Sequence, residues 1–83
     1  METFDFKIGW CRICNQGWLE IVKDKETQKL FICCTECESE WDSPEITNDV
    51  KLSTHNKYGM IEMPTYDEIK VYGWEKYTEN VND

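Results

Sequence analysis

The chain has 83 residues, 40% of them hydrophobic and 13% aromatic, which is enough for one small folded domain and too little for two. A core of this size is marginal, and small proteins commonly reinforce it with a metal, disulfides or a partner. The formal net charge of −8 disfavours binding to nucleic-acid phosphates or anionic membranes and favours a basic partner, although the same charge also promotes plain solubility.

The start of the chain lacks the basic and apolar regions of a secretory signal, because residues 1–6 include two acids. No apolar run approaches the roughly 18 residues that span a bilayer. We therefore expect a cytoplasmic protein without a membrane segment. In a reducing compartment, closely spaced cysteines are typical of metal ligands, and the odd count of five cysteines also argues against a disulfide framework.

The first pair of cysteines lies in the stretch "WCRICNQGW". Cys11 and Cys14 form a C-x-x-C motif, and a tight turn with this spacing lets both sulfurs converge on one ion. The residue after such a pair often needs a left-handed backbone conformation. Asn15 holds that position, and asparagine tolerates the conformation better than any residue except glycine.

Two β-favouring runs follow, residues 18–23 and 29–33, separated by the polar stretch "DKETQ". We expect them to form a β-hairpin in the register that gathers the aliphatic side chains on one face. The expected opposite pairs are Leu19 with Ile32, Ile21 with Leu30, Trp18 with Cys33, and Glu20 with Phe31.

A second C-x-x-C motif, Cys34 to Cys37, follows the second run, and nineteen residues separate it from the first motif. This spacing is typical of a four-cysteine zinc site. A hairpin returns its two ends to roughly 5 Å from one another, so both pairs would lie side by side. The sequence therefore predicts Cys11, Cys14, Cys34 and Cys37 as ligands of a structural Zn²⁺. Such a closed site leaves no coordination position for a substrate, so we expect no enzyme activity.

Cys33 is predicted not to be a ligand. Successive strand residues point to opposite faces, so Cys33 and Cys34 cannot both face the metal. Cys34 preserves the C-x-x-C spacing of the first pair, whereas Cys33 would lengthen it. We predict Cys33 to be a small buried hydrophobic residue beside Trp18.

Three other functions of the cysteines and the charged residues fit the sequence less well. Iron fits four sulfurs as well as zinc does and would make the chain a rubredoxin-like electron carrier, but residues 35–45 do not match the second rubredoxin loop. A thioredoxin-like role requires a helix that starts at the first cysteine, which the hairpin contradicts. A nucleic-acid-associated ribbon is disfavoured because the lysines at the hairpin tip alternate with acids. His55, the one histidine, is expected in a surface turn.

The segment after the second cysteine pair is strongly acidic, with six acids and no lysine or arginine between residues 36 and 49. Acids steer a basic protein towards its binding site, and an aromatic side chain commonly anchors it there. Trp41 is expected either to fold back onto the aliphatic face or to serve as such an anchor. The predicted partner-binding residues are Glu36, Glu38, Glu40, Asp42 and Glu45, with exposed Trp41 or Trp74 as the anchor.

Two helical segments are predicted later in the chain. The stretch "SPE" at residues 43–45 is typical of a helix start and predicts one or two turns. Thr65 and Glu68 form a capping box, and Gly73 ends the helix that begins there. Within this helix Ile69 shares a face with Tyr72, and the tryptophan after the glycine packs back on the last turn.

Residues 46–63 are left open between strand and loop. If they are strands, the sequence favours edge strands at Val50, Leu52 and Met60–Ile61 around the polar stretch "STHNKYG".

Residues 10–45, with two cysteine pairs flanking a hairpin, resemble a zinc ribbon. Members of that family usually have glycine after each pair, where this chain has Asn15 and Glu38. The whole chain, including "EWDSPE" and "YDEIKVYGWEKY", is similar to small bacterial zinc-ribbon proteins, and some proteins of this size and acidity are immunity proteins of toxins. The resemblance implies a non-enzymatic protein that binds a basic toxin, often a nuclease.

These observations together predict a single α+β domain over residues 1–83. It consists of a zinc ribbon at residues 10–45, formed by a β-hairpin with a cysteine turn at each end. We call these two turns, at residues 11–14 and 34–37, the first and second knuckle. A helical and loop cover follows at residues 46–77 and ends in a C-terminal helix. A polar tail occupies residues 78–83.

Overall fold

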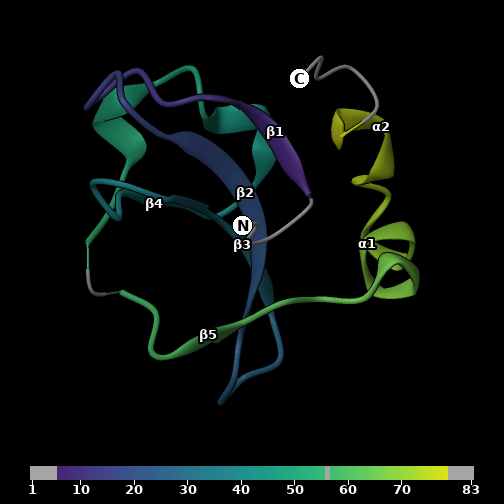
Figure 1. The fold of residues 1–83 in the computed structure, drawn as a ribbon. Coiled ribbons are helices and arrows are strands. Elements are labelled where there is room, and N and C mark those ends of the chain that lie inside the picture. The colour runs from purple at the N-terminus through teal and green to yellow at the C-terminus, as the bar shows by residue number, and fades with distance from the viewer. Residues whose placement is uncertain (1–5, 56, 79–83) are drawn as a thin grey trace.

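The computed structural model describes residues 6–55 and 57–78, which form a small α+β structure with an antiparallel sheet and short C-terminal helices (Figure 1). The strand order is β1-β2-β3-β4, and β5 also pairs with β2. The strands are β1 (Lys7–Trp10), β2 (Trp18–Asp24), β3 (Leu30–Cys34), β4 (Glu40–Trp41) and β5 (Ile61–Glu62). The 3-10 turns are η1 (Pro44–Ile46) and η2 (Val50–Leu52), and the helices are α1 (Tyr66–Tyr72) and α2 (Glu75–Thr78).

The predicted hairpin is present as β2 and β3, but its expected register was wrong by two residues. Leu19 pairs with Cys34, and Ile21 pairs with Ile32. A shift of two residues leaves every side chain on its expected face, so the apolar pattern does not distinguish the two registers. The turn decides between them. Its backbone closes with a 2.8 Å hydrogen bond from the Asp24 N–H to the Lys29 carbonyl.

The core lies on the aliphatic face of the sheet. Its buried members are Cys11, Leu19, Ile21, Leu30, Ile32, Cys34, Trp41, Ile69 and Trp74. Trp41 is 1% exposed and its indole N–H donates a 3.1 Å hydrogen bond to the Asp49 carbonyl. The expectation that Trp41 folds back onto this face is therefore confirmed. The expectation that Trp41 or Trp74 is exposed was wrong, because Trp74 is also only 9% exposed.

Helix α1 begins and ends where the sequence predicts. The Thr65 hydroxyl accepts from the Glu68 N–H at 3.2 Å, and the Glu68 carboxylate accepts from the Thr65 N–H at 2.8 Å. Gly73 has a φ of 73°, the left-handed conformation that ends the helix. The Trp74 N–H then donates to the Ile69 carbonyl at 3.1 Å, which turns the tryptophan back onto the core.

Residues 46–63, for which the sequence does not decide between strand and loop, contain the 3-10 turn η2 and the short strand β5. Val50 and Leu52 lie in the 3-10 turn η2 and are exposed, so neither forms an edge strand. Ile61 does belong to an edge strand, β5, which pairs with the end of β2. The helical start predicted at "SPE" is the single 3-10 turn η1.

The end of the described chain differs slightly from the prediction. Thr78, expected to begin the polar tail, is the last residue of α2, and residues 79–83 of that tail lie outside the described residues. Among the helices that the structure describes, none has the length and apolar character needed to cross a membrane.

Replacing Trp41 tests the assignment of the core. Trp41→Ala is expected to lower the free energy of unfolding by about 3–5 kcal/mol, because it removes a fully buried aromatic side chain. Trp10→Ala is the matched control, since Trp10 is 44% exposed and its removal should have a much smaller effect. Urea unfolding followed by circular dichroism measures both variants. Similar losses for the two tryptophans would contradict the place of Trp41 in the core.

Candidate metal centre

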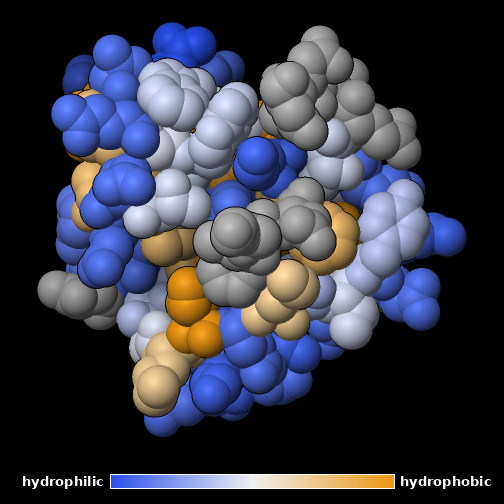
Figure 2. Space-filling view, in the orientation of Figure 1, coloured by the Kyte–Doolittle hydropathy of each residue, from blue (hydrophilic) through white to orange (hydrophobic). Residues whose placement is uncertain are grey.

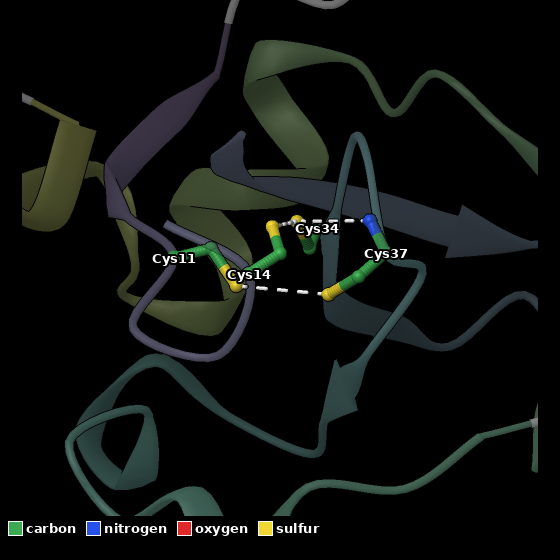
Figure 3. A group of neighbouring side chains, drawn as sticks. All are labelled: Cys11, Cys14, Cys34 and Cys37. Atoms are coloured by element: carbon green, nitrogen blue, oxygen red, sulfur yellow. Dashed lines mark hydrogen bonds between the residues drawn. The ribbon is translucent and has the colours of Figure 1, made fainter. Parts of the chain in front are cut away.

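The β2–β3 hairpin brings the two cysteine pairs together (Figure 3). The four sulfur atoms all lie within 4.8 Å of one another. Two sulfur pairs come from opposite knuckles: Cys11 and Cys37 are 3.7 Å apart, and Cys14 and Cys34 are 3.6 Å apart. A tetrahedron with Zn–S bonds of about 2.3 Å has edges of about 3.8 Å. The four-cysteine group therefore fits a tetrahedral metal ion.

Each knuckle is closed by a backbone hydrogen bond from its first cysteine, which spans six residues in the first knuckle and five in the second. The Cys11 N–H donates to the Gly17 carbonyl and the Cys34 N–H donates to the Ser39 carbonyl, both at 2.9 Å. Asn15 has a φ of 56°, so the left-handed conformation expected there is confirmed. Glu38 holds the equivalent place in the second knuckle with a φ of 64°. A left-handed glutamate is disfavoured by about 1 kcal/mol, which the interactions of the closed knuckle must offset.

Backbone N–H groups within the knuckles point at the sulfurs. The Ile13 N–H lies 3.4 Å from the Cys11 sulfur. The N–H groups of Glu36 and Cys37 lie 3.3 Å and 3.4 Å from the Cys34 sulfur. Hydrogen bonds of this kind favour the thiolate over the thiol, and the thiolate is the form that binds a metal.

Burial works against the thiolates. Cys11 and Cys34 are 0% and 1% exposed, and burial raises the pKa of Cys34 to about 12. For Cys37 burial also favours the thiol, but hydrogen bonds from Ser39, Cys34 and Cys11 together outweigh it and lower the pKa to about 6. Four thiolates in this space need a cation to compensate their charge, so metal binding would release protons and weaken in acid.

Gly17 permits the close contact of the two knuckles. A Cβ atom at this position would lie 2.7 Å from the Glu36 Cγ, 2.9 Å from the Thr35 Oγ1 and 3.0 Å from the Cys34 sulfur. The sequence places Gly17 only in the turn after the first cysteine pair. It does not reveal this contact, because the other segment begins seventeen residues away and leaves no local pattern. The same holds for Ser39, whose hydroxyl lies 3.2 Å from the Cys37 sulfur.

Cys33 lies outside the group of four, on the other face of the sheet. Its neighbours in register are Glu20 and Glu40, so the expected pairing of Cys33 with Trp18 was wrong. Burial and the negative charges of Glu40 and Glu38 raise the pKa of Cys33 to about 12. The side chain is therefore a neutral, half-buried thiol.

A cavity of about 420 Å³ opens on this second face of the sheet. Strand residues form its floor, and the segment that leads into β5 forms part of its wall. Carboxylates from Glu20, Glu38 and Glu40 are among its lining groups, together with apolar groups from Val22 and Met60. The cavity thus combines acidic and apolar surface.

The predicted partner-binding acids differ in their exposure. Glu36, Glu38, Asp42 and Glu45 are exposed. Glu40 is only 7% exposed, which its predicted role did not anticipate.

Contacts with Thr54 and Lys57 explain why Glu40 is buried. The Glu40 Oε1 accepts from the Thr54 hydroxyl at 3.0 Å and from the Lys57 N–H at 3.1 Å. Asp42 forms an ion pair with Lys57 at 2.9 Å, and hydrogen bonds from Lys57 and Tyr58 lower the pKa of its carboxyl group. Glu40 in β4 and Asp42 just after it therefore hold Thr54, Lys57 and Tyr58 in place.

Individual cysteine variants test the ligand set. Cys11→Ser, Cys14→Ser, Cys34→Ser and Cys37→Ser should each lose bound metal, because each removes one corner of the tetrahedron. Cys33→Ser is the matched control and should retain one metal ion per chain. Elemental analysis of the purified variants measures this. Metal loss in the Cys33 variant, or retention in two of the other four, would contradict the assignment.

Gly17→Ala tests the close contact of the knuckles. The added methyl group should lower the free energy of unfolding of the metal-bound protein by about 1–3 kcal/mol, as overpacking does elsewhere. Gly9→Ala is the control, because a Cβ at Gly9 meets nothing within 4 Å. Chemical unfolding in the presence of excess zinc compares the two, and an equal effect at both glycines would refute the contact.

No protein-family model, curated protein or solved structure matches this chain. Its function is therefore inferred from the chemistry of the four-cysteine group and of the surface around it.

Proposed function

We propose that this chain is a non-enzymatic protein-interaction module built around a structural Zn²⁺. Most concretely, it acts as an acidic inhibitor or immunity protein that binds a basic partner such as a toxin nuclease. The observation that carries the proposal is the four-sulfur group, whose 3.6 Å and 3.7 Å separations fit a tetrahedral ion. Four protein ligands complete such a site, so the metal has no free position for substrate or water.

The metal stabilises the fold rather than carrying out chemistry. Structural zinc sites contribute on the order of 10 kcal/mol to folding, which is large beside the stability of a small domain. Two of the four sulfurs belong to the hydrophobic core, so the metal joins the knuckles to the centre of the fold. Iron would fit the same sulfurs and would instead support electron transfer. An iron protein is red and a zinc protein is colourless, so the absorption spectrum separates the two.

Charge supports a basic partner. The chain has a formal net charge of −8, and four thiolates on one divalent cation would make it about two units more negative. Glu36, Glu38 and Glu45 are exposed on or just after the second knuckle. Opposite charges at such a surface accelerate encounter and select the partner.

The anchor for a partner cannot be Trp41 or Trp74 as the structure stands, because both are buried. The cavity on the second face of the sheet offers an alternative. Met60 and Ile61 line it and are 73% and 38% exposed, while its carboxylates supply negative charge. Figure 2 shows apolar side chains gathered near β5 within a mostly hydrophilic surface. This combination suits the aliphatic stem and cationic end of a lysine or arginine side chain.

Charge-neutralising variants test the interaction. The tagged chain is purified from its own host at low salt, and co-purifying proteins are identified by native mass spectrometry. We expect a basic protein in a one-to-one complex. Glu36→Gln combined with Glu45→Gln should slow its association by about an order of magnitude, because steering depends on these charges.

The matched control combines Glu26→Gln at the hairpin tip with Asp67→Asn in α1, both exposed acids away from the second knuckle. It should leave the association rate nearly unchanged. A chain that purifies with nucleic acid instead of protein would favour a nucleic-acid-associated ribbon. A chain that purifies alone from every growth condition would contradict the proposed partner.

A further inference from the structure

A hydrogen-bonded chain of side chains connects the four-cysteine group to a residue outside both knuckles. The Ser39 Oγ lies 3.2 Å from the Cys37 sulfur and 3.3 Å from the His55 Nε2. Ser39 is 0% exposed, whereas His55 is exposed on the segment that follows η2. His55 was expected only as a surface turn residue, and its sequence distance from the cysteines hides this contact.

If Cys37 is a metal-bound thiolate, its chemistry fixes which group donates in each of these two hydrogen bonds. A thiolate has no proton and can only accept a hydrogen bond. The single hydroxyl proton of Ser39 must then point at the Cys37 sulfur. The Ser39 oxygen is left as an acceptor, so His55 must present an Nε2–H group to it. Without the metal, a Cys37 thiol could itself donate to Ser39, and the direction would be undetermined.

His55 is held in place for this role by its neighbours. Thr54 and Glu40 exchange two backbone hydrogen bonds of 2.8 Å, and the Lys57 N–H donates to the Glu40 carboxylate at 3.1 Å. Thr54, directly before His55, and Lys57, two residues after it, are thus attached to Glu40 in β4, directly after the second knuckle. Among the residues that the structure describes, Ser39 supplies the one side-chain hydroxyl bonded to a sulfur of the group.

We propose that Ser39 and His55 are positioning residues of the metal centre, in which His55 orients the Ser39 hydroxyl and Ser39 holds and polarises the Cys37 thiolate. The inference rests on the metal binding proposed above and extends it to residues beyond the ligands. Removal of comparable outer partners in metal sites weakens metal binding about 10- to 100-fold. It also leaves the ligand sulfur richer in electron density.

Cobalt substitution gives a readout that a purely structural residue would not change. Ser39→Ala should weaken metal affinity by about 10- to 100-fold in chelator competition. It should also shift the thiolate-to-cobalt charge-transfer band to lower energy, because a thiolate without its hydrogen-bond donor gives up an electron more readily. His55→Ala should shift the same band in the same direction by a smaller amount. His55→Gln, which can place an amide N–H near the position of Nε2, should restore the wild-type band.

Ser43→Ala is the matched control, because the Ser43 side chain makes no capping hydrogen bond at η1. It should keep both the wild-type affinity and the wild-type band. A folded Ser39→Ala protein with an unshifted band would overturn the proposal, even if its affinity fell, since Ser39 would then act by packing alone. If Ser39→Ala does not fold, an unshifted band in His55→Ala would overturn it instead. A wild-type chain that binds neither cobalt nor zinc would refute the proposed metal site itself, and the two failures are therefore distinguishable.

Discussion

The structure depends on one constraint, which is that two cysteine knuckles separated by nineteen residues of sequence must meet at a single point. The β2–β3 ladder satisfies it, because an antiparallel hairpin returns the chain to its starting place, roughly 5 Å away. The knuckles then face each other, and the missing side chain at Gly17 leaves room for the side chains of Cys34, Thr35 and Glu36 in the second knuckle. A tetrahedral ion at this point would replace the larger core that a chain of 83 residues lacks.

The two faces of the sheet have different physical roles. The aliphatic face packs against Trp41, Ile69 and Trp74 and includes two sulfurs of the cysteine group, so the core and the four-cysteine group are parts of one unit. The other face holds a row of Glu20, Cys33 and Glu40 across three strands. Phe31 and Tyr58 stack with ring centroids 3.9 Å apart. The proposed interaction with a basic partner uses the acids and the cavity of this face together with the exposed acids on and after the second knuckle.

Much of this arrangement could be predicted from local sequence patterns. The paired cysteine spacing indicated the four residues that meet, and the capping box with Gly73 predicted the bounds of α1 because both signals lie within a few residues. The alternation of apolar residues along each strand also predicted which side chains of the hairpin face the core. The register of the hairpin was not predictable, since apolar alternation repeats every two residues and only the turn at Asp24 and Lys29 decides between the alternatives.

The features that sequence patterns did not predict depend on contacts between distant segments. Trp41 and Trp74 are buried because other elements cover them, and no local pattern distinguishes a covered tryptophan from an exposed one. Glu40 is buried because Thr54 and Lys57, which are fourteen and seventeen residues away, supply its hydrogen bonds. The link from Ser39 to His55 spans sixteen residues and is of the same kind. These contacts define the surroundings of the four-cysteine group rather than the cysteines themselves.

The most direct test of this account is native mass spectrometry of the purified chain, combined with circular dichroism before and after removal of metal by a chelator. We predict a mass of 9.9 kDa plus one zinc ion, with loss of the folded spectrum when the metal is removed and recovery when zinc is returned. A chain that carries no metal and keeps the same folded spectrum in the chelator would contradict the central claim, because the hairpin would then hold four reduced thiols without any ion.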